Sequence, residues 1–207
     1  VLGMIIAVIT AVSAMQAAGG LDYMVGAAGR MLRRRPQQVT WYAPLITYAL
    51  VFASGTQHVL YALLPVIAEV SRQAGIRPER PLSASVTAAQ CGVIASPIAA
   101  ATVALAGFIA GGGVTLPQIL LVTVPATLVG TALATLAVAF RGRDLADDPE
   151  YRRRLAAGTI TVPAAQPELD HASRRRAIGS CVVFLAAIVA VVVIGVLPEA
   201  RPTYVKV

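Results

Sequence analysis

The stretch VTWYAPLITYALVFASGTQHVLYALLPVIAEVS, residues Val39–Ser71, decides the fold of this chain. Two apolar arms, Val39–Ala53 and Val59–Ser71, flank the short polar segment Ser54–His58. Each arm is shorter than the roughly 20 residues that a helix needs to cross a bilayer. Irregular backbone at membrane depth is tolerated only inside protein or beside a water-filled cavity. The pattern predicts a re-entrant helical hairpin or, as the alternative, two tight spanning helices joined by a polar outside turn.

Composition places the whole chain in a membrane. Of its 207 residues 57% are hydrophobic and only 13% are charged, with a mean hydropathy of +0.74. An ordinary soluble domain carries about a quarter charged residues. The composition therefore excludes a soluble enzyme and a disordered protein. The net charge of +7 comes from basic residues between apolar runs, which is how membrane proteins set their orientation, so no nucleic-acid partner is expected.

Further apolar segments are long enough to span. They are Val1–Ala18, Ser83–Ala110, Pro117–Phe140 and Ala177–Leu197. Ser96-Pro97 interrupts the second of them, and proline removes a backbone donor and clashes with the preceding turn. We therefore expect an all-α, polytopic (multi-pass) integral membrane protein with a re-entrant hairpin and a broken helix.

Basic residues define the expected topology. They form three clusters, at Arg30 and Arg33–Arg35, at Arg72, Arg77 and Arg80, and from Arg141 to Arg176. If all three face the cytoplasm, each predicted span begins and ends on the side of the membrane that its neighbours in the chain require. The domains follow: a transmembrane transport repeat over 1–140 with the hairpin at about 39–72, a cytoplasmic loop over 141–176, and a further helix with an outer-side tail over 177–207. Val1 in place of a start methionine, followed at once by an apolar run, indicates an internal piece of a longer membrane protein.

Two smaller features can be interpreted in the same frame. The segment Leu21–Leu32 is amphipathic and ends in arginines, which is typical of an interfacial helix on anionic lipid, or of a plain topology-setting loop. Glu69 is expected to pair with Arg72 or with Arg33–Arg35 at the surface rather than to relay protons.

Catalytic constellations are absent from the sequence. His58 and His171 are the only histidines, and no phosphate-binding loop, zinc-protease motif or CxxC pair occurs. Cys91 and Cys181 lie in separate apolar segments and are expected to be packing residues. We therefore expect no enzyme, no cofactor and no metal.

Small neutral polar residues mark the candidate site instead. A helix that begins at mid-membrane offers free N–H groups and partial positive charge, which suits a carboxylate. Broken helices that meet at the midplane form the usual transporter site. His58 either titrates and couples protons to transport or stays neutral as a hydrogen-bonding group. The candidate substrate-binding residues are Ser54, Gly55, Thr56, Gln57, His58, Ser96 and Pro97, with Gln90 and Thr102 as further polar residues beside the second break.

Five stretches carry a resemblance to a known family. They read AVSAMQAAGGLDYMV (Ala11–Val25), MLRRRPQQVTWYAPLITY (Met31–Tyr48), SGTQHVLYALLPVIAEV (Ser54–Val70), GIRPERPLSASVTAAQCGVIASPIAAATVA (Gly75–Ala104) and LADDPEYRRRLAAG (Leu145–Gly158). Together they resemble the anaerobic C4-dicarboxylate transporter family of bacteria, the Dcu A/B type.

The resemblance implies a secondary carrier that takes up or exchanges C4-dicarboxylates such as fumarate, succinate, malate and aspartate across the bacterial inner membrane. It also implies two inverted repeats, an elevator-like motion, and substrate binding at Ser54–His58 and Ala95–Ile98. Family members are longer, so this chain would be one inverted-repeat half that needs a second half or a second copy, as in a homo-oligomer. Gln57 stands where relatives often carry glycine.

Two other functions remain open at this point. The first is a membrane-anchored interaction or sensor-partner protein, in which Arg141–Arg176 docks a cytoplasmic partner. The second is a carrier of another small organic anion. The expected partners are otherwise the dicarboxylate substrates and membrane lipid.

Overall fold

The structure is a computed structural model that describes residues 2–141, 145–158, 175, 178–183, 185–186 and 189–190. The described part is helical, with turns and no strand. The all-α expectation is therefore confirmed there. His171, most of the expected span Ala177–Leu197 and the tail after it lie outside the described residues.

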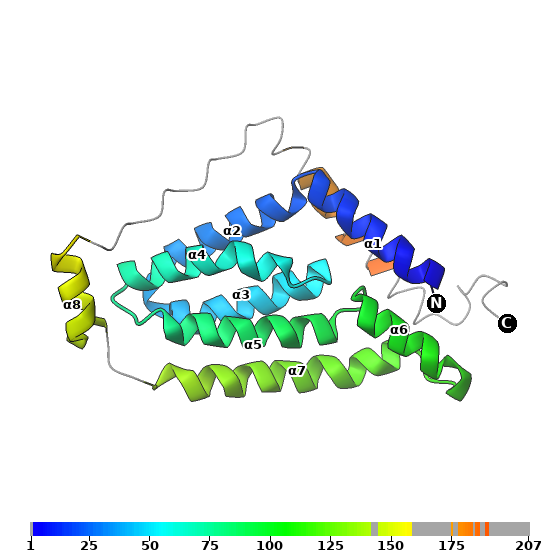
Figure 1. The fold of residues 1–207 in the computed structure, drawn as a ribbon. Coiled ribbons are helices and arrows are strands. Elements are labelled where there is room, and N and C mark those ends of the chain that lie inside the picture. The colour runs from blue at the N-terminus through cyan, green and yellow to red at the C-terminus, as the bar shows by residue number, and fades with distance from the viewer. Residues whose placement is uncertain are drawn as a thin grey trace.

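Eight α-helices and three short 3₁₀ turns follow one another through the described residues (Figure 1). The helices are α1 (Leu2–Ala17), α2 (Gly20–Arg34), α3 (Val39–Ser54), α4 (His58–Gln73), α5 (Glu79–Ala95), α6 (Ala100–Ile109), α7 (Leu116–Ala139) and α8 (Pro149–Ala156). The 3₁₀ turns are η1 (Pro36–Gln38), η2 (Ala110–Gly112) and η3 (Leu145–Asp147).

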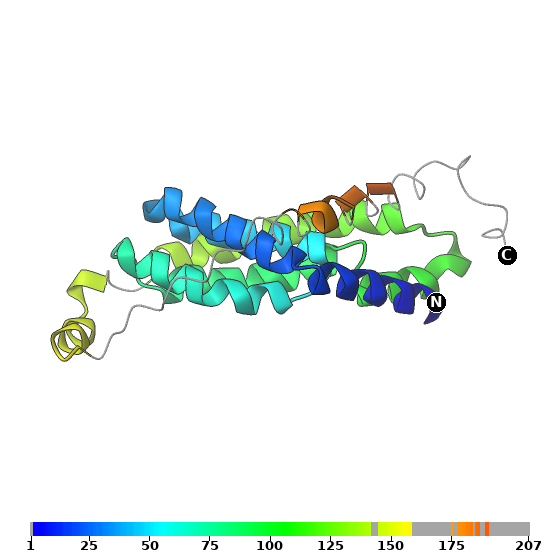
Figure 2. The ribbon, with the colours of Figure 1, turned by 90° about the horizontal axis from the view of Figure 1, so that it is seen from above.

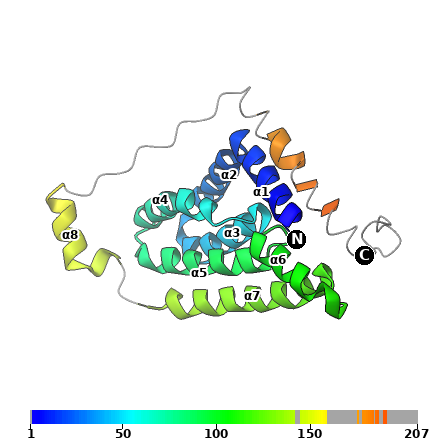
Figure 3. The same ribbon diagram turned by 45° about the vertical axis from the view of Figure 1, so that its right-hand side comes forward.

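Helices α3, α4 and α5 form the centre of an elongated bundle (Figures 1 and 2). Helix α2 packs on α4, and α7 packs on α5 and extends past the ends of α3, α4 and α5. Helices α1 and α6 contact each other at the end opposite α8 (Figures 1 and 3). Two interruptions, one between α3 and α4 and the other between α5 and α6, thus lie along the flank of α7.

Local sequence explains where these helices begin and end. α3 ends because Gly55 has φ +66°, a left-handed conformation that glycine adopts without strain, and the N–H of Gly55 donates to the Val51 carbonyl at 2.8 Å. α5 ends at Ser96, whose ψ of 128° is extended, as expected for a residue before proline. α7 begins at a capping box formed by Thr115 and Gln118.

The α3–α5 contact is the tightest part of the core. Gly92 of α5 is buried against α3, and a Cβ added there would lie 2.9 Å from the Tyr48 carbonyl oxygen. Val51 of α3, whose Cβ would lie 3.3 Å from the same added atom, belongs to one buried cluster with Val59 and Leu63 of α4, all three with no exposed surface. The absence of a side chain at position 92 therefore sets the separation of the hairpin from α5.

Helix α2 differs from what its sequence suggested. We expected Leu21–Leu32 to lie on the membrane surface or to form a loop, but α2 packs lengthwise on α4. Its buried face includes Val25, Ala28 and Leu32, and a Cβ on Gly29 would lie 3.3 Å from Val66 Cγ1. The apolar stripe that a lipid surface could cover is covered by protein instead.

Two helical stretches are long and apolar enough to cross a membrane. They are Glu79–Ile109, which comprises α5 and α6, and Leu116–Ala139, which is α7. Only 17% of the most apolar stretch of α7 is buried. The outer face of this helix carries the exposed side chains of Leu121, Val122 and Leu133. The inner face carries Thr127, Thr131 and Thr135, each of which donates its hydroxyl to the carbonyl four residues back.

The elements that carry the first two basic clusters, and those that carry the third as far as Arg154, lie at one end of the bundle. The end of α2, the α4–α5 turn, the end of α7 and α8 all lie there (Figure 1). Buried Glu69 accepts hydrogen bonds from Arg72 and from Gln73, the latter at 2.7 Å, so its expected pairing with Arg72 is confirmed, although at a buried rather than a surface position.

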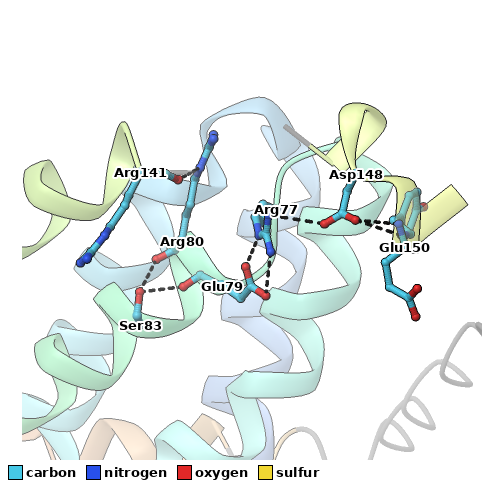
Figure 4. Close-up of polar contacts among 8 residues, drawn as sticks. Arg77, Glu79, Arg80, Ser83, Arg141, Asp148 and Glu150 are labelled. Atoms are coloured by element: carbon cyan, nitrogen blue, oxygen red, sulfur yellow. Dashed lines mark hydrogen bonds and ion pairs between the residues drawn. The ribbon is translucent and has the colours of Figure 1, made fainter. Parts of the chain in front are cut away.

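Ion pairs attach α8 to this end (Figure 4). Arg77 pairs with Glu79 and, at 3.4 Å, with Asp148, while Arg80 Nε donates to the Arg141 carbonyl at 2.8 Å. Asp148 also caps α8 by accepting the N–H groups of Glu150 and Tyr151.

Arginines also hold the acidic side chain in the first turn of α8. Hydrogen bonds from Arg154 and Arg153 lower the pKa of Glu150. This contribution to α8 stability is fully present above the ordinary carboxyl pKa of 4.5 and is lost as the pH falls through the lowered value.

Gly92→Ala should loosen the α3–α5 contact. The new Cβ would press on the Tyr48 carbonyl, and overpacking of this kind costs about 1–3 kcal/mol, so the midpoint of thermal unfolding in detergent should fall. Gly26→Ala is the control, because the nearest atom to its Cβ is the flexible tip of Arg30, at 3.6 Å. An unchanged midpoint for Gly92→Ala would contradict the assignment.

Asp148→Ala should fray α8 because it removes both the cap and the partner of Arg77. Loss of an N-cap costs about 1 kcal/mol, so amide hydrogen exchange in residues 149–156 should accelerate roughly fivefold. Asp148→Asn keeps a capping oxygen and should exchange close to the unsubstituted rate. Equal acceleration in both variants would show that the charge, not the cap, holds the helix.

Candidate functional site

The tip of the α3–α4 hairpin is short and held from within. Ser54 is fully buried, and its hydroxyl donates to the carbonyls of Val51 at 3.3 Å and Thr56 at 3.2 Å. Thr56 Oγ1 accepts the N–H of His58 at 3.4 Å. The hydroxyls of this segment therefore order the tip itself.

The interruption between α5 and α6 packs directly on that tip. A Cβ on Gly55 would lie 2.7 Å from Ile98 Cγ1 and 3.2 Å from the Ile98 carbonyl carbon. Ser96 is also fully buried, and its hydroxyl donates to the Phe52 carbonyl at 2.7 Å and accepts the Ile98 N–H at 3.4 Å. Glycine at position 55 thus allows both the turn and the close approach of the second segment.

Hydroxyl groups cover the helix C-termini at this junction. The carbonyls near the ends of α3 and α5 carry partial negative charge and would repel an anion. Those of Val51, Phe52 and Ile94 accept hydroxyls from Ser54, Ser96 and Thr102, respectively. These three carbonyls near the negative ends of the two helices are therefore satisfied by the protein without the addition of a charge.

The N-terminus of α4 is covered only in part, because Thr56 Oγ1 accepts the N–H of His58, the first residue of the helix. Gln57 occupies the N-cap, but its side chain makes no hydrogen bond to the first N–H groups of the helix. Its Nε2 donates instead to Gln90 Oε1 on α5, at 2.5 Å. α6 likewise begins at this junction, at Ala100. The starts of α4 and α6 thus bring helix N–H groups to the junction, the kind of donor that suits an anion.

The structure brings all seven predicted residues into one region but divides them by exposure. Ser54, Ser96 and Pro97 are buried, whereas Gly55, Thr56 and Gln57 are partly exposed. His58 is exposed, with its ring centroid 6.4 Å from that of Tyr61. Surface access is therefore concentrated at Thr56, Gln57 and His58.

Three participants were missing from the predicted site. Gln90 was expected only as a polar residue beside the second break and was not paired with Gln57, and Ile98 was expected only as the end of the segment that the resemblance implies and was not paired with Gly55. The Phe52 carbonyl gave no signal that sequence reasoning could use. The described residues contain no group of His, Cys, Asp or Glu side chains able to hold a metal ion.

Helix ends that meet beside apolar helices long enough to cross a bilayer are an arrangement found in helical membrane transport proteins. The family model described as "Anaerobic c4-dicarboxylate membrane transporter" matches residues 1–207, and the chain belongs to this family. It is therefore a membrane protein.

Curated relatives agree with the family. The chain is 38% identical over 188 residues to the C4-dicarboxylate transporter DcuA of Helicobacter pylori (strain ATCC 700392 / 26695), covering 91% of this chain and 42% of the relative. It is 39% identical over 198 residues to DcuA of Escherichia coli (strain K12), covering 95% and 45%. It is 36% identical over 215 residues to the anaerobic C4-dicarboxylate transporter DcuB of Escherichia coli O6:H1, covering 97% and 47%.

The chain thus spans less than half the length of these relatives. No solved structure matches it.

Gly55→Ala should destabilise the junction, because alanine is strained at φ +66° and its Cβ would collide with Ile98. We expect a lower midpoint of thermal unfolding in detergent, with a loss of roughly 1–3 kcal/mol. Ile98→Ala removes the colliding Cγ1 but not the backbone strain. The double variant should therefore be destabilised by less than the sum of the two single variants. Additive effects of the two substitutions would contradict the contact.

Proposed function

We propose that this chain forms one half of a secondary carrier that exchanges or takes up C4-dicarboxylates such as fumarate, succinate, malate and aspartate across the bacterial inner membrane. Family membership supports the substrate class, since the relatives are named C4-dicarboxylate transporters. The observation that carries the site is the junction of Gly55 with Ile98, where hydroxyl-bonded carbonyls lie together with a helix N-terminus that its own N-cap side chain does not bind.

A dicarboxylate is the chemistry that this junction fits. A carboxylate accepts hydrogen bonds but donates none, so it matches the N–H groups that begin α4 and α6. Helix N-termini, hydroxyls and amides bind it without burying a permanent positive charge in the membrane. In this proposal Thr56, Gln57 and His58 contact the substrate, and buried Ser54 and Ser96 position the two segments, with Gly55 and Pro97 shaping them.

Helix lengths support a hairpin that enters the membrane and returns. α7, with 24 residues, is about 36 Å long, whereas each 16-residue arm of the hairpin reaches about 24 Å, less than the ~30 Å of the hydrocarbon core. Near the tip, Phe52 packs in one cluster with Val124 of α7, about 12 Å along that helix from Leu116. The tip therefore stops within the first third of α7, short of its Leu116 end.

The other wall of the site is assigned to a second inverted repeat or to a second copy of this chain. The relatives are more than twice as long as the matched region, which leaves room for such a half. Exchange of one dicarboxylate for another would follow if the two halves alternately expose the junction to each side of the membrane. The basic end of the bundle would face the cytoplasm.

Exchange of labelled succinate for internal fumarate in proteoliposomes tests the proposal. The chain is measured alone and together with the part of the Escherichia coli DcuA relative that lies outside the match, with complete DcuA as positive control. Succinate, but not a monocarboxylate of the same length, should also raise the thermal midpoint of the chain. Absence of both exchange and stabilisation would reject the dicarboxylate assignment.

Thr56→Val should raise the succinate KM roughly tenfold or more, or abolish exchange, because a hydrogen bond to a charged group is worth about 1.5–3 kcal/mol. The matched control is Thr87→Val on α5, where the exposed hydroxyl donates only to the Ser83 carbonyl. Unchanged exchange by a well-expressed Thr56→Val carrier would falsify the role of the tip.

A further inference from the structure

Four arginines at the end of α2 differ from those elsewhere at the basic end of the bundle. Arg30, Arg33, Arg34 and Arg35 are exposed. No carboxylate in the described part of the chain pairs with any of them, whereas Arg72, Arg77, Arg153 and Arg154 each pair with Glu or Asp. The α2 arginines therefore present positive charge that the described protein does not neutralise.

A rigid helix presents these charges. α2 is fixed by its buried face on α4, so its last turn is a fixed platform. Arg30, Arg33 and Arg34 lie at i, i+3 and i+4 and share one face. The guanidinium tips of Arg30 and Arg33 lie back along Gly26 and Gly29, 3.6 and 3.8 Å from where a Cβ would be placed on those glycines.

Exposed apolar residues flank the arginines. Met31 is 54% exposed, Trp41 48% and Leu45 54%. Trp41 lies in the first turn of α3, which follows α2 after only η1. Tryptophan concentrates at the boundary between headgroups and hydrocarbon. On α7 the same boundary is marked by Phe140, 81% exposed, directly before Arg141.

We propose that the end of α2 binds the headgroups of anionic phospholipids, with Trp41 at the boundary below them. A guanidinium binds phosphate through two parallel hydrogen bonds, which a choline headgroup's own positive charge disfavours. The combination of unpaired charge and adjoining apolar surface fits a lipid, which offers a phosphate and acyl chains together. An acidic soluble protein would match the charge but not the exposed Met31 and Leu45.

The single tryptophan of the chain makes the proposal directly measurable. The full chain is reconstituted in vesicles of phosphatidylcholine and phosphatidylglycerol, with bromine on the acyl chains of one lipid at a time to quench Trp41. At equal mole fraction, brominated phosphatidylglycerol should quench at least twice as strongly as brominated phosphatidylcholine. Equal quenching by the two lipids would overturn the proposal.

A matched pair of variants separates this site from the general field of the basic end. The triple variant Arg33→Gln, Arg34→Gln and Arg35→Gln should be quenched equally by the two brominated lipids. Arg152→Gln with Arg153→Gln and Arg154→Gln removes the same charge from α8 and should leave the preference intact. Loss of preference in both variants would reject a site on α2.

Membrane insertion of each variant is checked by protection of its spans from protease. Lipid preference does not require transport, so a failure of dicarboxylate exchange and a failure of lipid binding are separate results.

Discussion

The contact between Gly55 and Ile98 is the constraint on which the arrangement of the helices depends. It brings the turn of the hairpin against the gap between α5 and α6, so that four helix ends lie in one place. Backbone groups at helix ends must find partners when they are removed from water. Here the carbonyl ends find theirs in serine and threonine hydroxyls, and the N–H end of α4 is left without a cap from its own N-cap side chain.

This difference between the carbonyl ends of α3 and α5 and the N–H end of α4 links the packing of the junction to the ligand it suits. The hydroxyls of Ser54 and Ser96, which sequence reasoning placed in contact with substrate, satisfy carbonyls in the interior. They stabilise the junction and remove its negative partial charges without introducing an ionisable group. In the proposed site, recognition of an anion would be a property of chain direction at Thr56–His58 rather than of any single charged side chain.

Much of the fold could be predicted from residue patterns because local rules govern it. The polar join after Ala53 and the proline after Ser96 placed the interruptions close to where α3 and α5 end. The role of Ser96 could not be predicted, because it depends on the Phe52 carbonyl, 44 residues away. Nor could the packing of α2, because an amphipathic stripe is equally compatible with lipid and with another helix, and only the contact of Gly29 with Val66 decides between them.

The threonines of α7 have a mechanical consequence. Thr127, Thr131 and Thr135 return their hydroxyl hydrogens to their own helix and so make no demand on α5 for a hydrogen-bond acceptor. Among the described side chains, movement of α7 along its neighbours would break the bond of Thr127 with Tyr48, at 2.9 Å, and that of Arg80 with the Arg141 carbonyl. Within the described part of the chain, these two hydrogen bonds, one in the middle of the helix and one just after its end, are contacts that would resist sliding of α7.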